Sequence, residues 1–287
     1  MNRRQFLEKA GKLGGAALVS SFTGAPVFAG NLEGMVMSGF WTGDFFHQDC
    51  VDASGEATGV VRARVNGVWH DYSLARLPRS FTDWNLEARQ EMLENLRRMV
   101  SGQGGSPPSL AGPHNAAMAT LGHRREDSIL EVNNAFKGMG LCPRRELIRD
   151  KIRIMNETMG ESMPAKLEFL HEMYGDAGNF DLTKLITLEL YSTPDFETHT
   201  FLNLMSEPVT SLVFLDRKSY EVRGIGQLVH PEDPDAGEYP KDIVEYTNIA
   251  HSYFHGAFPR LFPGILVHVV EVFDNTPGTG RGVSLTD

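Results

Sequence analysis

The sequence predicts an α+β protein, in which a hairpin and helices come first and strands interrupted by helices follow. Apolar and polar side chains alternate on both sides of Asn66-Gly67, a strong hairpin signal because both turn residues need a positive φ. From Thr82 the apolar residues change to a helical period. The apolar runs at 209–215 and 219–229 are typical of strands in a buried sheet.

The first part of the fold, residues 30–160, is expected to be an α+β segment with this hairpin and two helices. Residues 53–74 are strand-like, and the first helix begins near Thr82. Residues 101–113 are rich in Gly, Pro and Ser and predict a loop. A second helix is expected at 143–159, since proline suits the first helical turn.

The second part, residues 161–287, is expected to be richer in strands and to end in a Gly/Pro-rich tail that begins at Thr276. Proline at 208 is expected to end the first helix of this part. The expected elements are strands at 167–173 and 182–191, a helix at 196–205, strands at 209–215 and 219–229, a helix at 243–255 and a last strand at 265–273.

The N-terminus carries an export signal pattern. Arg3-Arg4 leads a charged region, residues 13–19 are mildly apolar, and Ala29 completes a small-residue cleavage site. Residues 1–29 thus resemble a twin-arginine signal peptide, read by the export machinery through the paired arginines. The resemblance implies a periplasmic protein that is exported folded, often around a tightly bound cofactor.

Composition restricts the classes of partner. The formal net charge is −10, which repels a phosphate backbone and argues against nucleic acid. No stretch approaches the roughly 20 consecutive apolar residues that a membrane-spanning helix needs, so no transmembrane segment is expected. The two cysteines, Cys50 and Cys142, leave two alternatives open: one disulfide bridge, or two separate buried thiols.

Residues 198–216 read as a short Thr-rich turn, a helix, a break at Glu207-Pro208 and an apolar strand, and residues 220–226 follow with Val-Arg-Gly. This order resembles the FMN-binding split barrel superfamily, which includes pyridoxamine 5′-phosphate oxidase and flavin reductases. The similarity extends over about residues 163–275, with Glu207 where the family often has asparagine. It implies a C-terminal split β-barrel, bound FMN and a homodimer that shares the cofactor.

The predicted phosphate site is the turn Thr198-His199-Thr200. Hydroxyl and backbone donors near a helix N-terminus favour an anion. By the resemblance, Thr198 stands for the family's serine and Thr200 for its basic residue. The missing cation would then be supplied by His199 or by a base from elsewhere. The alternative is that Thr198 only caps the helix.

Further cofactor contacts are expected from the resemblance. Thr187 and Tyr191 would lie along the isoalloxazine ring, and His255 would reach the flavin from the end of its helix. His251 and His255 also have the i, i+4 spacing that can bind a metal, although two ligands are too few. A purely structural role for this pair is the remaining alternative.

A second group of possible metal ligands occurs at Asp44, His47 and Cys50, within one short segment. Three such residues supply only part of a metal site. The segment is therefore interpreted as an ordinary loop, and no metal ion is predicted.

The function expected from these features is an FMN-dependent oxidoreductase of the periplasm, acting on a small-molecule substrate or redox partner. No catalytic acid or base is predicted, and residues 30–160 are expected to set specificity. The alternatives are a non-catalytic split barrel that binds haem or another ligand, and a cofactor-free accessory subunit of an exported redox complex. A homodimer interface is expected at the apolar run Phe258, Leu261, Phe262, Ile265 and Leu266.

Overall fold

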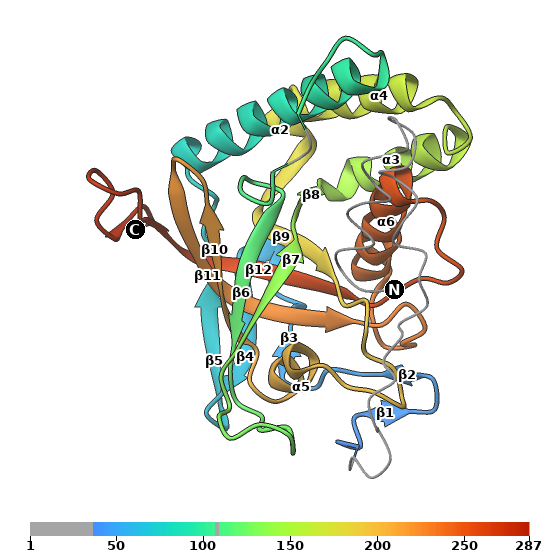
Figure 1. Cartoon of the computed structure of the whole chain (residues 1–287). Coiled ribbons are helices and arrows are strands. Elements are labelled where there is room, and N and C mark those ends of the chain that lie inside the picture. The colour runs from blue at the N-terminus through green and yellow to red at the C-terminus, as the bar shows by residue number, and fades with distance from the viewer. Residues whose placement is uncertain (1–36, 107–108, 287) are drawn as a thin grey trace.

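The computed structural model describes residues 37–106 and 109–286, and it has an α+β architecture around a curled antiparallel half-barrel sheet (Figure 1). The predicted signal peptide, residues 1–29, lies outside the described residues. Within the described residues seven strands follow one another across this sheet, and β13 (Val283–Ser284) pairs with β12 beside them. In sheet order they are β7 (Asn133–Gly138), β6 (Asn115–Thr120), β10 (Val209–Leu215), β11 (Ser219–Val229), β12 (Gly264–Asp274), β9 (Phe180–Leu188) and β8 (Gly140–Pro143).

The two edge strands of this sheet are neighbours in the chain. Only Met139 separates β7 from β8, yet β7 pairs with β6 while β8 pairs with β9. Gly138 lies opposite Asn115 at one edge, and Gly140 lies opposite Ile186 at the other. One stretch of chain therefore joins both edges, so the sheet must curl to bring its two edges near each other.

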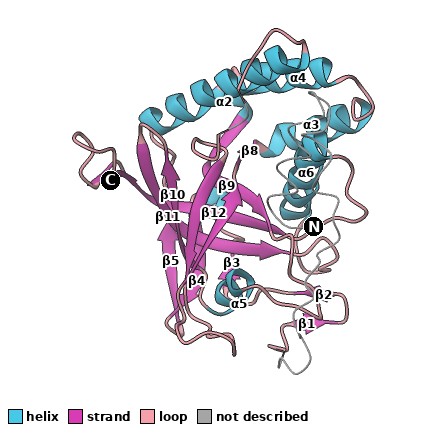
Figure 2. Cartoon of the chain, in the orientation of Figure 1, coloured by secondary structure: helices cyan, strands magenta, loops and turns pink. Residues whose placement is uncertain are grey.

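Five α-helices cover this sheet in the described part of the chain (Figures 1 and 2). α2 and α4 lie side by side at one end, α3 packs against α6, and α5 lies near the opposite end (Figure 1). No described helix combines the length and apolar character needed to cross a membrane. The helices are α2 (Arg79–Val100), α3 (Arg145–Glu157), α4 (Met163–Tyr174), α5 (His199–Ser206) and α6 (Glu238–His255).

The predicted hairpin is confirmed as the central and outer strands of a separate three-stranded sheet. Asn66 and Gly67 at its turn have φ values of 51° and 79°, the left-handed region that the sequence signal requires. Val61 and Ala63 of the hairpin are buried against Ile225 of β11. The remaining short elements are β1 (Trp41–Thr42), β2 (Phe45–Phe46), β3 (Val51–Asp52), η1 (Glu56–Thr58), β4 (Val60–Val65), β5 (Val68–Ser73) and η2 (Ala177–Asn179).

The core is continuous from the sheet to the helices that cover it. Aromatic side chains make two of the connections. Phe81 of α2 packs edge-on against Phe214 and Tyr220, with ring centroids 5.3 Å apart in both pairs. Phe46 of β2 packs edge-on against Phe201 of α5 at 4.9 Å. Such pairs add about 0.5–1.5 kcal/mol each beyond the contribution of their buried area. They attach α2 to β10 and β11 of the sheet, and α5 to the β2 segment.

The expected strand at 167–173 is wrong, because these residues belong to helix α4. Leu167, Leu170 and Met173 are the buried side chains of this helix, and their three-residue spacing places them on one helical face. The short apolar run could be read with either period from the sequence alone. The expected helices near 82, 143 and 243 and the strands at 209–215 and 219–229 are confirmed.

The boundary expected at residue 160 does not separate two sheets. Strands β6, β7 and β8 precede it, yet they belong to the same sheet as β9 to β12. The curled sheet is therefore built from both parts of the chain, and the segment before residue 160 supplies both of its edges.

Candidate functional site

The N-terminal end of α5 is where the sequence places an anion. Thr198 is the N-cap residue, and its side-chain oxygen accepts a hydrogen bond from the backbone N–H of Phe201 at 3.1 Å. The capping interpretation of Thr198 is thus what the structure shows. His199 and Thr200 are the first two helical residues, whose N–H groups have no partner within an α-helix.

The two side chains that follow the cap point to different surroundings. Thr200 is 2% exposed, and its hydroxyl accepts a hydrogen bond from the Asn133 side chain of β7 at 3.0 Å. His199 is partly exposed, and its Nε2 lies 3.6 Å from the Asp127 carboxylate. Partial burial, together with nearby Arg125, lowers the pKa of His199. A neutral imidazole is therefore favoured at this position.

A chain of hydrogen bonds leads from β7 to the cap of α5. Lys137 Nζ lies 2.7 Å from Glu189 Oε2, in an ion pair whose carboxylate is fully buried. Ser192 Oγ contacts the other oxygen of Glu189 at 3.3 Å and Thr198 Oγ1 at 3.2 Å. A cation from the β7 edge of the sheet is thus connected to the start of α5.

A small pocket lies beside this helix end, between the β6–β7 loop, the segment before α5 and the first described residues. Arg125 lies at its border: its guanidinium contacts the Asp127 carboxylate at 2.6 and 2.7 Å and the backbone oxygen of Glu197 at 2.9 Å. Groups of both charges line the pocket. They are Met37, Ser38, His123, Arg124, Arg125, Glu126, Asp195, Phe196, Glu197 and Leu202.

Sequence reasoning missed Lys137, Glu189 and Arg125 as members of this site. They lie on β7, just after β9 and on the β6–β7 loop, and only the curling of the sheet brings them together. Each is an ordinary charged residue in its own segment, so no local signal marks it. The sequence predicts only that a basic residue from elsewhere in the chain would replace the missing cation, without identifying which residue.

The two predicted ring contacts have different surroundings. Thr187 is 3% exposed within β9, opposite Ile265 of β12. Tyr191 is 50% exposed, and its backbone N–H lies 3.3 Å from Glu189 Oε1. Tyr191 thus belongs to the hydrogen-bond chain that ends at α5, whereas Thr187 lies in the sheet interior.

His255 lies at the end of α6, next to His251. The two imidazole centroids are 4.5 Å apart, and the ring of His251 stacks on Phe258 at 4.8 Å. Burial and the neighbouring His255 lower the pKa of His251 to about 4, and burial lowers the pKa of His255. Neutral imidazoles that pack against each other and against Phe258 fit a structural role, which is one of the alternatives that the sequence left open.

The cysteines are two separate buried thiols, which excludes the disulfide alternative. Burial raises the pKa of Cys50 to about 11 and that of Cys142 to about 12, so neither is a thiolate at neutral pH. Cys50 Sγ lies 3.5 Å from the backbone oxygen of Leu204 on α5. The thiol therefore faces α5, while His47 pairs with Asp233 elsewhere.

A scan against protein-family models finds no match for this sequence, and a search of curated proteins finds no similar chain. The function of the site must therefore be argued from its own residues.

Proposed function

We propose that this chain is an FMN-dependent oxidoreductase with the FMN-binding split barrel fold, and that it holds the FMN phosphate at the N-terminal end of α5. Two features support the fold proposal: the resemblance at residues 198–226, and the single stretch of chain that joins both edges of the curled sheet. The proposal includes the periplasmic location, the shared-site homodimer and a small-molecule substrate or redox partner.

The observation that carries the proposal is the set of donors around α5. The first N–H groups of this helix, at His199 and Thr200, lie where the helix dipole favours an anion. Arg124 lines the adjoining pocket and is exposed, whereas the neighbouring Arg125 is paired with Asp127. The Lys137–Glu189 pair reaches the cap through Ser192.

These contacts change the predicted roles of the two threonines. The hydroxyl of Thr198 already caps α5, and that of Thr200 already bonds Asn133. In our proposal the phosphate is therefore held by backbone N–H groups and by the Arg124 guanidinium, and the threonine side chains position the helix. Bound FMN would supply the hydride chemistry, and the protein would supply orientation and electrostatics.

The test compares FMN with riboflavin, which has the same ring system but no phosphate. Both are titrated into the purified protein, and into an Arg124→Glu variant that reverses the charge beside the pocket. Arg79→Glu is the matched control, because Arg79 is a highly exposed arginine of α2, and this helix lies at the opposite end of the sheet from α5 (Figure 1).

The expected result is tighter binding of FMN than of riboflavin, with a loss of FMN affinity of at least about tenfold in Arg124→Glu, since charge-assisted bonds contribute roughly 1.5–3 kcal/mol. Riboflavin affinity should stay unchanged in both variants. Equal affinity for the two flavins would contradict the phosphate site. A purified protein that shows haem bands, or that binds no flavin, would contradict the flavin function.

A further inference from the structure

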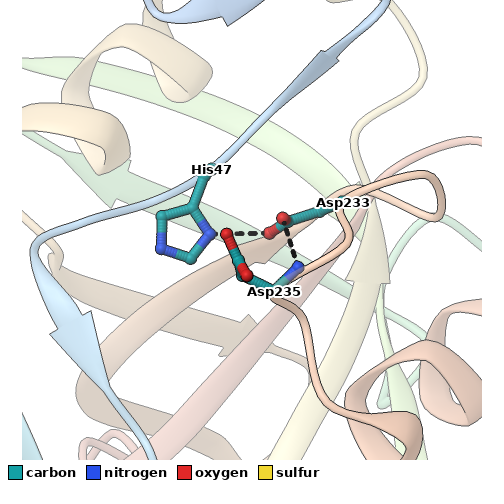
Figure 3. Close-up of side chains that lie close together, drawn as sticks. All are labelled: His47, Asp233 and Asp235. Atoms are coloured by element: carbon teal, nitrogen blue, oxygen red, sulfur yellow. Dashed lines mark hydrogen bonds and ion pairs between the residues drawn. The ribbon is translucent and has the colours of Figure 1, made fainter.

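Three potential metal ligands, none of which lines the pocket at the N-terminal end of α5, converge at one place (Figure 3). His47 follows β2, whereas Asp233 and Asp235 lie in the loop between β11 and α6. One ligand atom from each residue lies within 4.8 Å of the other two. Two segments separated by 186 residues in the sequence thus contribute to one cluster.

The carboxylate of Asp233 is the centre of this cluster. Its side chain is 5% exposed, and Oδ2 lies 2.8 Å from His47 Nδ1. Its other oxygen accepts the backbone N–H of Asp235 at 3.0 Å. A buried carboxylate needs a compensating cation, and among the residues that the structure describes Asp233 has no arginine or lysine partner.

The surroundings add further negative charge. The carboxylates of Asp44, Glu232 and Asp233 all act on the neighbouring imidazole of His230, with Arg260 as an opposing charge. The side chain of Asp235 is exposed, so the cluster is open to solvent on one side. An ion could enter from that side without any rearrangement of the core.

We propose that His47, Asp233 and Asp235 bind a divalent transition-metal ion of the zinc type. One imidazole nitrogen and two carboxylate oxygens form a mixed donor set that zinc accepts, and water from the open side would complete the coordination. Magnesium and calcium prefer oxygen ligands alone, so they fit this set less well. The bound ion would replace the direct hydrogen bond between His47 and Asp233.

The ion would also have a structural effect. The segment that ends at His47 includes Phe46, which packs against Phe201 of α5. A metal that joins His47 to the β11–α6 loop would hold this segment in place, and with it the packing of Phe46 against α5. Binding should therefore raise the thermal unfolding temperature, because a ligand that binds only the folded state stabilises it.

The test is a calorimetric titration of the full, chelator-treated protein with Zn²⁺, repeated with Mg²⁺. Asp235→Asn removes one charged ligand from an exposed position, and His47→Ala removes the nitrogen ligand. Asp235→Asn keeps the test valid even if His47→Ala folds poorly. His70→Ala, at an exposed histidine of β5, and His251→Ala, at the histidine pair of α6, are the controls.

The proposal requires one zinc ion per chain, at least tenfold tighter binding of Zn²⁺ than of Mg²⁺, and at least tenfold weaker zinc binding in Asp235→Asn and His47→Ala. Both control variants should bind like the original protein, and a given zinc concentration should raise its melting temperature more than that of Asp235→Asn. The proposal is overturned if zinc does not saturate one site, or if both ligand variants keep their affinity. It is equally overturned if His251→Ala abolishes binding.

Discussion

A fully buried lysine, Lys184, and a partly buried one, Lys137, both contact carboxylates on or next to strand β9, but their surroundings differ. Lys184, within the strand, is fully buried and contacts Asp181 and, at 2.6 Å, Glu56. The ring of Tyr239 lies 5.2 Å from its ammonium nitrogen. Lys137 contacts Glu189, just after the strand, and from there hydrogen bonds lead to the cap of α5.

The charges in the enclosed cluster stabilise one another. Burial by itself would lower the pKa of Lys184, but Asp181 and Glu56 outweigh it, so that the pKa is raised. Burial would raise the pKa of Asp181, but the charge of Lys184 outweighs it and the pKa is lowered. Both groups are therefore ionised at neutral pH, and the second carboxylate, Glu56, also has the exposed Arg145 at 3.8 Å.

Burial of a charged pair does not by itself identify a functional site. In the Lys184 cluster the ammonium group is fully buried, and its contacts hold η1, β9 and α6 together. The Lys137–Glu189 pair is connected by hydrogen bonds to the N-terminal end of α5, which lies beside a pocket. An anion bound at that helix end would therefore alter the electrostatic environment of the pair.

The largest effect is expected for Lys184→Met. The variant leaves Asp181 and Glu56 without their buried cation, and breaking such a cluster costs about 3–5 kcal/mol of the free energy of unfolding. Denaturant unfolding measures the loss. Arg79→Met, which breaks the exposed Arg79–Asp83 pair, is the control and should cost under about 1 kcal/mol. Equal losses in the two variants would show that the Lys184 cluster contributes no more than a surface pair.

A smaller loss of stability is expected for Lys137→Met, about 1–3 kcal/mol, because Glu189 keeps Ser192 and the Tyr191 N–H as donors. This variant should also weaken FMN binding, whereas the folded fraction of Lys184→Met should bind FMN normally. Flavin titration and denaturant unfolding of both variants check the two effects. If Lys137→Met binds FMN unchanged, the functional distinction between the two lysines fails.

Low pH is expected to reduce the stability of the protein through His268, which lies opposite Lys184 in the β12–β9 register. Burial, and then the charge of Lys184, lower the pKa of His268 to about 3. The unfolded chain takes up this proton near pH 6.5 and the folded protein does not, so stability falls as the pH drops below about 6.5, by up to roughly 1.4 kcal/mol per pH unit.

Melting temperatures between pH 7 and 4.5 measure this dependence, and His268→Gln should make it shallower. Asp181 does not contribute in this window. Its pKa is lowered on folding, so its stabilisation is complete above the unfolded value of about 3.9 and is lost only below it. An unchanged slope in His268→Gln would assign the acid sensitivity to other histidines, such as His230 and His251, whose pKa values are about 4.

The smallest effect is expected for Thr198→Ala, about 1 kcal/mol, because it removes the cap of α5. The matched control is Thr247→Ala on α6, whose hydroxyl bonds the backbone oxygen of Ile243 within the helix and caps nothing. Thermal unfolding of both variants distinguishes them. A loss in Thr247→Ala as large as that in Thr198→Ala would show that the cap has no special importance.

Local patterns in the sequence were sufficient for much of the fold. The turn at Asn66-Gly67, the strands β10 and β11 and the cap at Thr198 each follow from neighbouring residues. Backbone sterics, the two-residue period of a strand and the unpaired N–H groups of a helix end are all properties of short segments. A single sequence can therefore predict them.

Only the tertiary structure decided how the sheet closes and which charges meet. Strands β6 and β7 are rich in small and polar residues, and their pairing depends on partners far along the chain. Lys137 approaches Glu189, and His47 approaches Asp233, only after the sheet has curled and the loops have packed. Contacts between distant segments depend on burial and geometry summed over the whole fold, and no local window of sequence contains that information.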